Sequence, residues 1–173
     1  MLELEALGKD RLLELVHLRG RNWLTIDGLW IQAVEKAYGT EVCLRMYTSV
    51  MEQFQRISAR RIARFLGIPQ GKASLSSMLE AHKITGGGVE AAYAKTSDRE
   101  AVVSFLNCRP QQGRIEKGQA IFPCKEMELA GMSSFFEELN PKARVDCLYC
   151  PPNTRPKDLP QAVSCQWKLT IRD

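Results

Sequence analysis

Five of the six cysteines lie in the second half of the chain, and three of these have the spacing of metal ligands. Cys147 and Cys150 form a C-x2-C pair, and Cys165 follows fifteen residues later. Such a pair lets two thiolates converge on one ion across a tight turn, and a structural zinc ion takes four ligands in a tetrahedron. The spacing therefore predicts a thiolate metal site that needs one more ligand.

Cys124 is the expected fourth ligand. It lies at the start of the helix predicted for residues 123–139, where free backbone N–H groups and the helix dipole stabilise a thiolate. Cys108 is the alternative and could replace either Cys124 or Cys165. Zinc is the expected metal, because an iron–sulfur cluster also takes four thiolates but usually shows denser cysteine spacing.

Two other interpretations of the cysteines stay open. Free cysteine is among the most buried residue types, so these thiols could simply be structural. Alternatively, one cysteine could be a redox or nucleophilic group, and Cys124 is then the candidate. A nucleophile needs a nearby base, and nothing in the sequence places His17 or His82 beside Cys124.

The elements that must position these thiols fall into two parts. Helical spacing of apolar residues predicts a first helix that ends at Tyr38–Thr40, with a break or bend within Gly20–Gly28. A second helix is expected from Thr40 to Gly67, and a short third helix at Ser74–Ala81.

A triple glycine, residues 86–88, is expected to be the hinge into a sheet. The last strand alternates well, with Cys165 and Trp167 on its inward face. We therefore predict one α+β domain over residues 1–173, with a helical part (1–85) packed on a small antiparallel β-β-α-β-β sheet (86–173). The expected elements of the second part are strands at Val89–Lys95 and Ala101–Cys108, a loop at Pro110–Gly118, a helix at Pro123–Leu139, and strands at Ala143–Cys150 and Val163–Ile171.

Two charged residues interrupt apolar helical stripes. Asp27 lies on one line with Trp23 and Trp30, and Arg61 lies on a line of apolar residues in the second helix. Burying a lone charge is costly, so we expect Asp27 and Arg61 to meet. Trp23, Asp27, Trp30 and Arg61 would then border a small-ligand pocket between helices and sheet. A purely structural ion pair is the favoured alternative, and Glu35 is expected to face solvent.

The net charge and the start of the chain predict the cellular location of the protein and its classes of partner. The net charge is +4, and the start of the chain resembles neither a secretory signal nor a membrane span. We therefore expect a cytoplasmic protein with reduced thiols and no membrane partner. The arginines within residues 56–64 are typical of a solvated helix face, which makes nucleic acid a disfavoured partner. A homodimer stays open.

A set of motifs extends over nearly the whole chain: Asn22-Trp23-Leu24 with Asp27-Gly28-Leu29-Trp30 and Glu35, Ala59-Arg60-Arg61-Ile62, Cys108-Arg109-Pro110-Gln111 with Arg114, Phe122-Pro123-Cys124-Lys125, Cys147-x-x-Cys150-Pro151-Pro152, and Cys165-x-Trp167. This set resembles an uncharacterised family of cytosolic proteins from anaerobic bacteria and archaea, which implies no activity. More distantly, the order of helices, sheet and late cysteines is similar to 4-vinyl reductase-type ligand-binding domains and to the aminothiazoline-carboxylate hydrolase-like family.

Our expectation is thus a cytoplasmic domain that binds a small-molecule ligand and carries a zinc-like site of Cys124, Cys147, Cys150 and Cys165. One alternative is a small hydrolase, either metal-dependent or using Cys124 as nucleophile. Another is a thiol redox or regulatory module. The sequence leaves open whether the protein is an enzyme.

Overall fold

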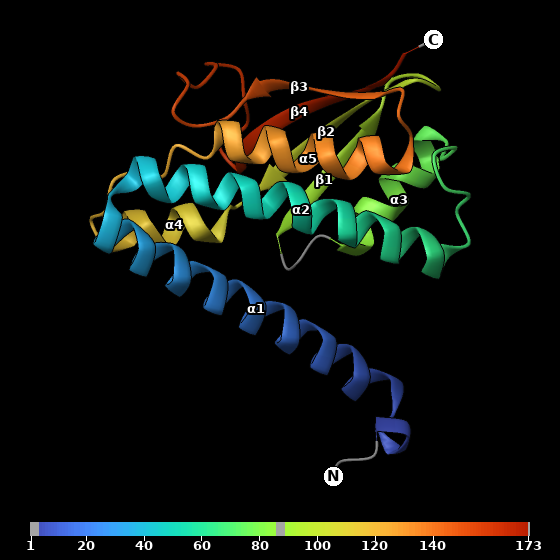
Figure 1. Cartoon of the computed structure of the whole chain (residues 1–173), viewed down its shortest axis with the longest axis horizontal. Helices are drawn as coiled ribbons and strands as arrows, with labels where there is room; N and C mark the ends of the chain where they lie inside the picture. The colour runs from blue at the N-terminus through green and yellow to red at the C-terminus, as the bar shows by residue number, and fades with distance from the viewer. Residues whose placement is uncertain (1–3, 86–88, 173) are drawn as a thin grey trace.

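The computed structural model describes residues 4–85 and 89–172, which form an α+β fold of helices stacked on an antiparallel sheet (Figure 1). The triple glycine expected as a hinge lies outside the described residues. The elements are η1 (Leu4–Ala6), α1 (Lys9–Tyr38), α2 (Thr40–Leu66), α3 (Leu75–Thr85), β1 (Glu90–Lys95), β2 (Glu100–Leu106), α4 (Arg109–Glu116), α5 (Lys125–Leu139), β3 (Ala143–Tyr149) and β4 (Val163–Ile171).

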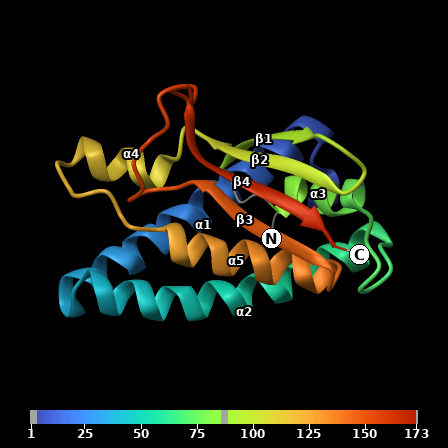
Figure 2. The same ribbon diagram turned by 90° about the horizontal axis from the view of Figure 1, so that it is seen from above.

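The four strands are ordered β1-β2-β4-β3, and every neighbouring pair is antiparallel. Helix α5 packs against the sheet, and α2 runs alongside α5 on the other side (Figure 2). The expected antiparallel α+β architecture is confirmed. The β-β-α-β-β order needs one addition, because the loop expected at residues 110–118 is largely helix α4. Pro110 suits the first turn of a helix, where its missing N–H costs nothing.

The long first helix corrects a second expectation. Helix α1 runs without interruption through Gly20 and Gly28, where a break was expected. A glycine costs a helix only about 1 kcal/mol relative to alanine, which the good helix formers around it offset. Helix α2 ends as expected at Gly67, whose φ of 68° places it in the left-handed region that caps helices.

The core lies between α5 and the sheet. Trp167, Phe135 and Phe136 are fully buried there. Along β4 the inward positions alternate with partly exposed ones, which confirms the pattern expected for this strand. Cys165 and Trp167 therefore share the face that meets α5. No helix of the described residues is long and apolar enough to cross a membrane.

His82 on α3 is buried among aromatic rings. Its ring lies 5.2 Å from that of Phe136 and 5.4 Å from that of Phe135, and its Nδ1 is 2.7 Å from the Tyr93 hydroxyl. Burial lowers the pKa of His82 to about 4. The imidazole is thus neutral in the folded protein at any pH near neutrality.

We expect His82 to destabilise the protein in acid. Its folded pKa lies below the unfolded value of 6.5, so the unfolded chain gains protons first as pH falls from 6.5 towards 4. Between pH 7.5 and pH 5, wild type should lose about 2 kcal/mol more unfolding free energy than His82→Phe. Urea titrations at both pH values measure this. Equal losses in the two proteins would contradict it.

Candidate functional site

Three cysteine sulfurs meet where α5, β4 and the turn after β3 come together. Cys124 immediately precedes α5, Cys150 follows β3, and Cys165 lies on β4. The Sγ atoms of Cys124 and Cys150 are 3.7 Å apart, and Cys165 lies near enough to Cys150 to help raise its pKa. Cys150 is fully buried, whereas Cys124 keeps part of its surface. The structure therefore brings together three of the four cysteines predicted as ligands.

Two side chains outside the cysteines hold this cluster. Gln111 on α4 clamps the segment before Cys124, because its amide donates to the Phe122 carbonyl (2.7 Å) and accepts from the Phe122 N–H (3.0 Å). The same Nε2 lies 3.4 Å from the Cys124 sulfur. On β4, the Trp167 indole N–H donates to Cys165 Sγ over 3.3 Å. N–H donors aimed at sulfur favour its ionised form.

Cys124 is the thiol of the cluster that ionises most readily. Hydrogen bonds from Cys150 and then Gln111 lower the pKa of Cys124, against an opposing effect of burial. The pKa of Cys150 is strongly raised, chiefly because it interacts with Cys124 and Cys165 and also because it is buried. Cys150 is therefore the proton-carrying partner that donates to the Cys124 sulfur.

Glu128 is a neighbour that the sequence analysis missed. It lies one helical turn after Cys124 on α5, and burial raises the pKa of its carboxyl to about 7. Its charge in turn raises the pKa of Cys124 and of Cys108. The i, i+4 spacing from Cys124 was the available signal, but it carries no information on burial.

The two remaining late cysteines stay at the edge of the cluster. Cys147 sits opposite Trp167 on the sheet, and among the described residues no hydrogen bond joins it to another thiol. Cys147 and Cys108 have raised pKa values, in both cases mainly through burial. A bulge lies between Cys147 and Tyr149, inside the C-x2-C pair, and Cys147 itself packs against the edge of the core.

The four-thiolate metal site therefore stays a prediction. Among residues 4–85 and 89–172, no group of three or more histidine, cysteine, aspartate or glutamate side chains is arranged to hold a metal ion. Cys124, Cys150 and Cys165 are neighbours, but their sulfurs do not surround a common point with a further ligand.

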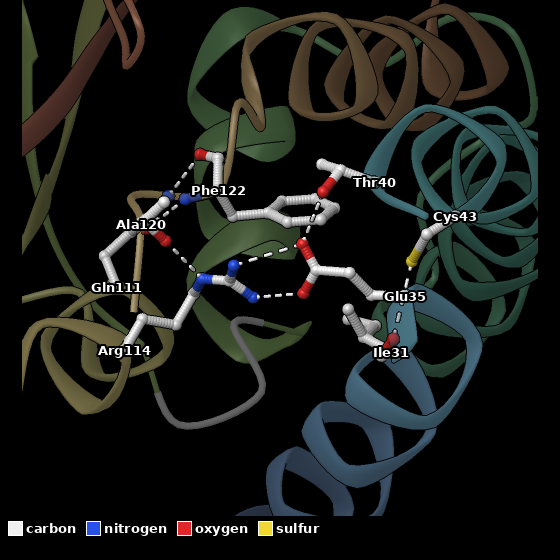
Figure 3. A network of polar contacts seen from close by, with 8 residues as sticks. All are labelled: Ile31, Glu35, Thr40, Cys43, Gln111, Arg114, Ala120 and Phe122. Atoms are coloured by element: carbon white, nitrogen blue, oxygen red, sulfur yellow. Dashed lines mark hydrogen bonds and ion pairs between the residues drawn. The ribbon is translucent and has the colours of Figure 1, made fainter. Parts of the chain in front are cut away.

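An ion pair beside the cluster joins α1 to α4 (Figure 3). Arg114 binds Glu35 through both terminal nitrogens, at 2.7 and 3.1 Å, and the two side chains are only 13% and 18% exposed. The expectation that Glu35 faces solvent was wrong. Its pKa is lowered first by the hydrogen bond from Arg114 and further by that from Thr40.

Arg114 also organises the chain that leads to Cys124. Its Nε donates to the Ala120 carbonyl over 2.7 Å, and its guanidinium lies over the ring of Phe122, 5.4 Å from the centroid. Figure 3 shows Gln111 and Arg114 reaching this segment side by side from α4. The sequence showed both residues in one motif, but not their long-range partners.

The four residues expected to bind a ligand do not enclose one pocket. Asp27 accepts a hydrogen bond from the Tyr47 hydroxyl (2.5 Å), so its expected pairing with Arg61 was wrong. Arg61 lies fourteen residues beyond Tyr47 on α2, which is about 21 Å along a helix. Trp23 stacks on Phe54 at 5.7 Å.

Arg61 borders a hollow that opens on the surface of α2 and α3. Trp30 is 71% exposed. The hollow has a volume of about 290 Å³ and is lined by Phe54, Ser58, Arg61, Ile62, Phe65 and Thr85. Residues of the sheet do not line this hollow, so the expected pocket between helices and sheet stays a prediction.

The Glu35–Arg114 pair should be measurably stabilising. We expect Arg114→Ala to lower the unfolding free energy by about 3 kcal/mol, because it leaves a largely buried carboxylate without its partner. A double-mutant cycle with Glu35→Gln should give a coupling of about 1–3 kcal/mol at pH 7. The pKa of Glu35 is lowered in the fold, so the coupling should fade as pH drops below 4.5. Additive effects of the two substitutions would contradict a direct interaction.

Glu128 should have the opposite pH dependence. Its folded pKa of about 7 exceeds the unfolded value of 4.5, so ionising it costs stability as pH rises through this range. Glu128→Gln should therefore gain roughly 1–3 kcal/mol relative to wild type between pH 5 and pH 8, allowing for the water that still reaches the side chain. Urea titrations test this, with Glu126→Gln as the exposed control on the same helix. A wild type–variant difference that does not vary with pH would contradict it.

Comparison with known proteins gave one match. Neither a search of curated proteins nor a search of solved structures found a match to this chain. No comparison returned the 4-vinyl reductase-type domains or the aminothiazoline-carboxylate hydrolase-like family. The model of a family of unknown function (DUF6125) matches residues 5–171, which agrees with the expectation of an uncharacterised family. The chain therefore belongs to this family of unknown function, DUF6125.

Proposed function

We propose that the protein is a cytoplasmic thiol–disulfide module whose reactive pair is Cys124 and Cys150. The observation that carries the proposal is the 3.7 Å separation of the two sulfurs, of which Cys150 is fully buried and Cys124 is partly exposed. A disulfide needs an S–S distance of about 2.05 Å, so a small side-chain movement suffices to join them. The two residues would thus cycle between a dithiol and a disulfide.

The proposed reaction is exchange with a small-molecule disulfide, RSSR. The Cys124 thiolate attacks one sulfur of RSSR, forming a mixed disulfide and releasing RS⁻. Cys150 gives its proton to RS⁻, and its sulfur then attacks the Cys124 sulfur. The second R group leaves as a thiolate that takes a proton from water. Starting from the Cys124 thiolate and the Cys150 thiol, the pair loses two electrons and one proton, the second proton comes from water, and RSSR becomes two RSH.

The environments of the two cysteines suit these roles. Cys124 keeps part of its surface open, and its lowered pKa supplies the nucleophile. Cys150 has no exposed surface, so its sulfur reaches only the neighbouring cysteines. Glu128 would tune the pair, because its charge at pH above 7 opposes the Cys124 thiolate.

A metal site is the second candidate, and the third thiol favours it. Cys165 adjoins Cys150, and the 3.7 Å between Cys124 and Cys150 is close to the edge of about 3.8 Å that a ZnS₄ tetrahedron with 2.3 Å bonds would have. Cys147 or Cys108 would supply the fourth sulfur after a side-chain rotation. Either zinc or an iron–sulfur cluster would then lock the thiols against exchange.

The remaining expectations have less support. Small-ligand binding by Trp23, Asp27, Trp30 and Arg61 would need a different arrangement of α1 and α2. A Cys124-dependent hydrolase would need a general base, and the buried His82 faces Tyr93 and the phenylalanine cluster. Glu128 is the nearer candidate base, since its pKa of about 7 suits proton transfer near neutral pH.

We expect oxidised glutathione to convert the reduced protein into a form lighter by two hydrogen atoms, with Cys124 linked to Cys150 in peptide maps. Cys150→Ser should stop at the mixed disulfide on Cys124, and Cys124→Ser should react at least about tenfold more slowly. Cys43→Ser, which removes a buried thiol on α2, is the matched control and should behave as wild type.

Metal analysis of the freshly purified protein separates the two candidates. A stoichiometric metal ion whose removal exposes the three thiols would replace the redox proposal with the metal site. Equal reaction rates of wild type and Cys124→Ser, without metal, would reject both roles for Cys124.

A further inference from the structure

A third thiol, that of Cys165, lies beside the reactive pair of Cys124 and Cys150 but has no role in the exchange described above. Cys150 is fully buried and Cys165 is 9% exposed, and both belong to the core cluster against which Cys124 packs. All three are free thiols. A thiol next to a reactive pair can itself exchange with the disulfide that the pair forms.

The strand register places Cys150 level with Cys165. Strands β3 and β4 lie side by side (Figure 2), and after the bulge in β3 the register pairs Tyr149 with Gln166. Continued by one residue, this register sets Cys150 opposite Cys165. Directly opposed residues of an antiparallel pair have Cα atoms about 4.5–5.5 Å apart, within the roughly 4.4–6.8 Å that a disulfide spans. Without the extra residue of the bulge, Tyr149 would stand opposite Cys165 instead.

The contacts of the three sulfurs agree with this register. The Cys150 Sγ lies 3.7 Å from the Cys124 Sγ, and Cys165 lies near enough to Cys150 to help raise its pKa. The Cys165 sulfur is held by the indole N–H of Trp167, at 3.3 Å. Cys150 therefore has two thiol neighbours, one at the start of α5 and one on β4.

We propose that Cys165 is the final disulfide partner of Cys150, an inference that rests on the proposed exchange reaction. After RSSR has joined Cys124 to Cys150, Cys165 gives its proton to water and its sulfur attacks the Cys150 sulfur. The bond between Cys150 and Cys165 forms, and the bond between Cys124 and Cys150 breaks. The released Cys124 thiolate can take one proton back from water. No electrons enter or leave, because one disulfide replaces another.

Two properties of the site favour this rearrangement. Cys124 is the thiol of the cluster that ionises most readily, and a sulfur with a lower thiol pKa is the better leaving group. The new disulfide lies in the core beside the fully buried Trp167, so dissolved thiols have little access to it. Reduction therefore begins at the partly exposed Cys124, whose sulfur attacks Cys150 again.

The rearrangement also frees the nucleophile of the module. Oxidation would otherwise consume Cys124, but the exchange with Cys165 returns its sulfur to the thiolate form. The oxidised chain can then react with a second RSSR, releasing RS⁻ and carrying the other RS group as a mixed disulfide on Cys124. The ligand class is thus a small-molecule thiol, and the buried disulfide removes Cys150, the partner that would expel it.

Timed peptide mapping of the full chain tests the proposal. Reduced wild type receives one equivalent of oxidised glutathione and is quenched in acid at increasing times. The link between Cys124 and Cys150 should appear first and be replaced by a link between Cys150 and Cys165. An alkylating reagent added before the quench should label Cys124 in late samples but not in early ones. Cys147→Ser is the matched control on β3, and the same two links in this variant assign them to Cys150.

Cys165→Ala should stop at the first disulfide and lose the late labelling of Cys124. Cys165→Val is the second variant, since it fills more of the buried space, and the wild-type map is decisive without either. A link between Cys124 and Cys150 that persists in wild type would overturn this inference and leave the proposed function standing. A Cys150–Cys165 link that forms as fast in Cys124→Ser would overturn the proposed order. No disulfide in wild type, with Cys124→Ser reacting equally fast, would reject the proposed function itself and this inference with it.

Discussion

The packing of α5 against β4 positions nearly everything else in this molecule. Trp167 on β4 and Phe135 and Phe136 on α5 are fully buried in one apolar cluster. Because α5 is fixed on this face, its N-terminal end places Cys124 beside Cys150, which follows β3, and near Cys165, which lies close to the start of β4. The other side of α5 holds α2, and α2 carries α1. The thiol cluster is thus a consequence of core packing.

The cluster is chemically asymmetric although its members are identical residues. Burial alone raises the pKa of a thiol, as it does for Cys108 and Cys147. Cys124 departs from this because it receives hydrogen bonds from both Cys150 and Gln111. One sulfur therefore accepts and its neighbour donates, which lets a single charge reside among several buried thiols. Nucleophilic chemistry and metal binding both begin from such a thiolate.

Local pattern was sufficient for much of the fold but for only part of the site. The alternation of β4 specified the inward direction of Cys165, and the end of α2 at Gly67 followed from local stop signals. Partners that lie far apart in sequence were not readable, as with Glu35 and Arg114 or Asp27 and Tyr47. The C-x2-C spacing of Cys147 and Cys150 also gave no sign of the bulge that lies between Cys147 and Tyr149. The alternation of apolar and polar residues along a strand does not reveal a one-residue change in strand register.

Helix α4 shows how the exposed and buried parts of the molecule are joined. It has eight residues, none of them buried, and includes Gly113, so it has little stability of its own. Two of its side chains hold it in place: Arg114 binds Glu35 of α1, and Gln111 clamps the segment before Cys124. The angle at which α1 leaves the body and the position of the Cys124 sulfur therefore rest on the same short helix. A third contact holds the start of this helix, because the N–H of its N-cap residue Cys108 donates to Ser164 Oγ on β4 over 2.9 Å. Helix α4 therefore links α1, the segment before Cys124 and the sheet.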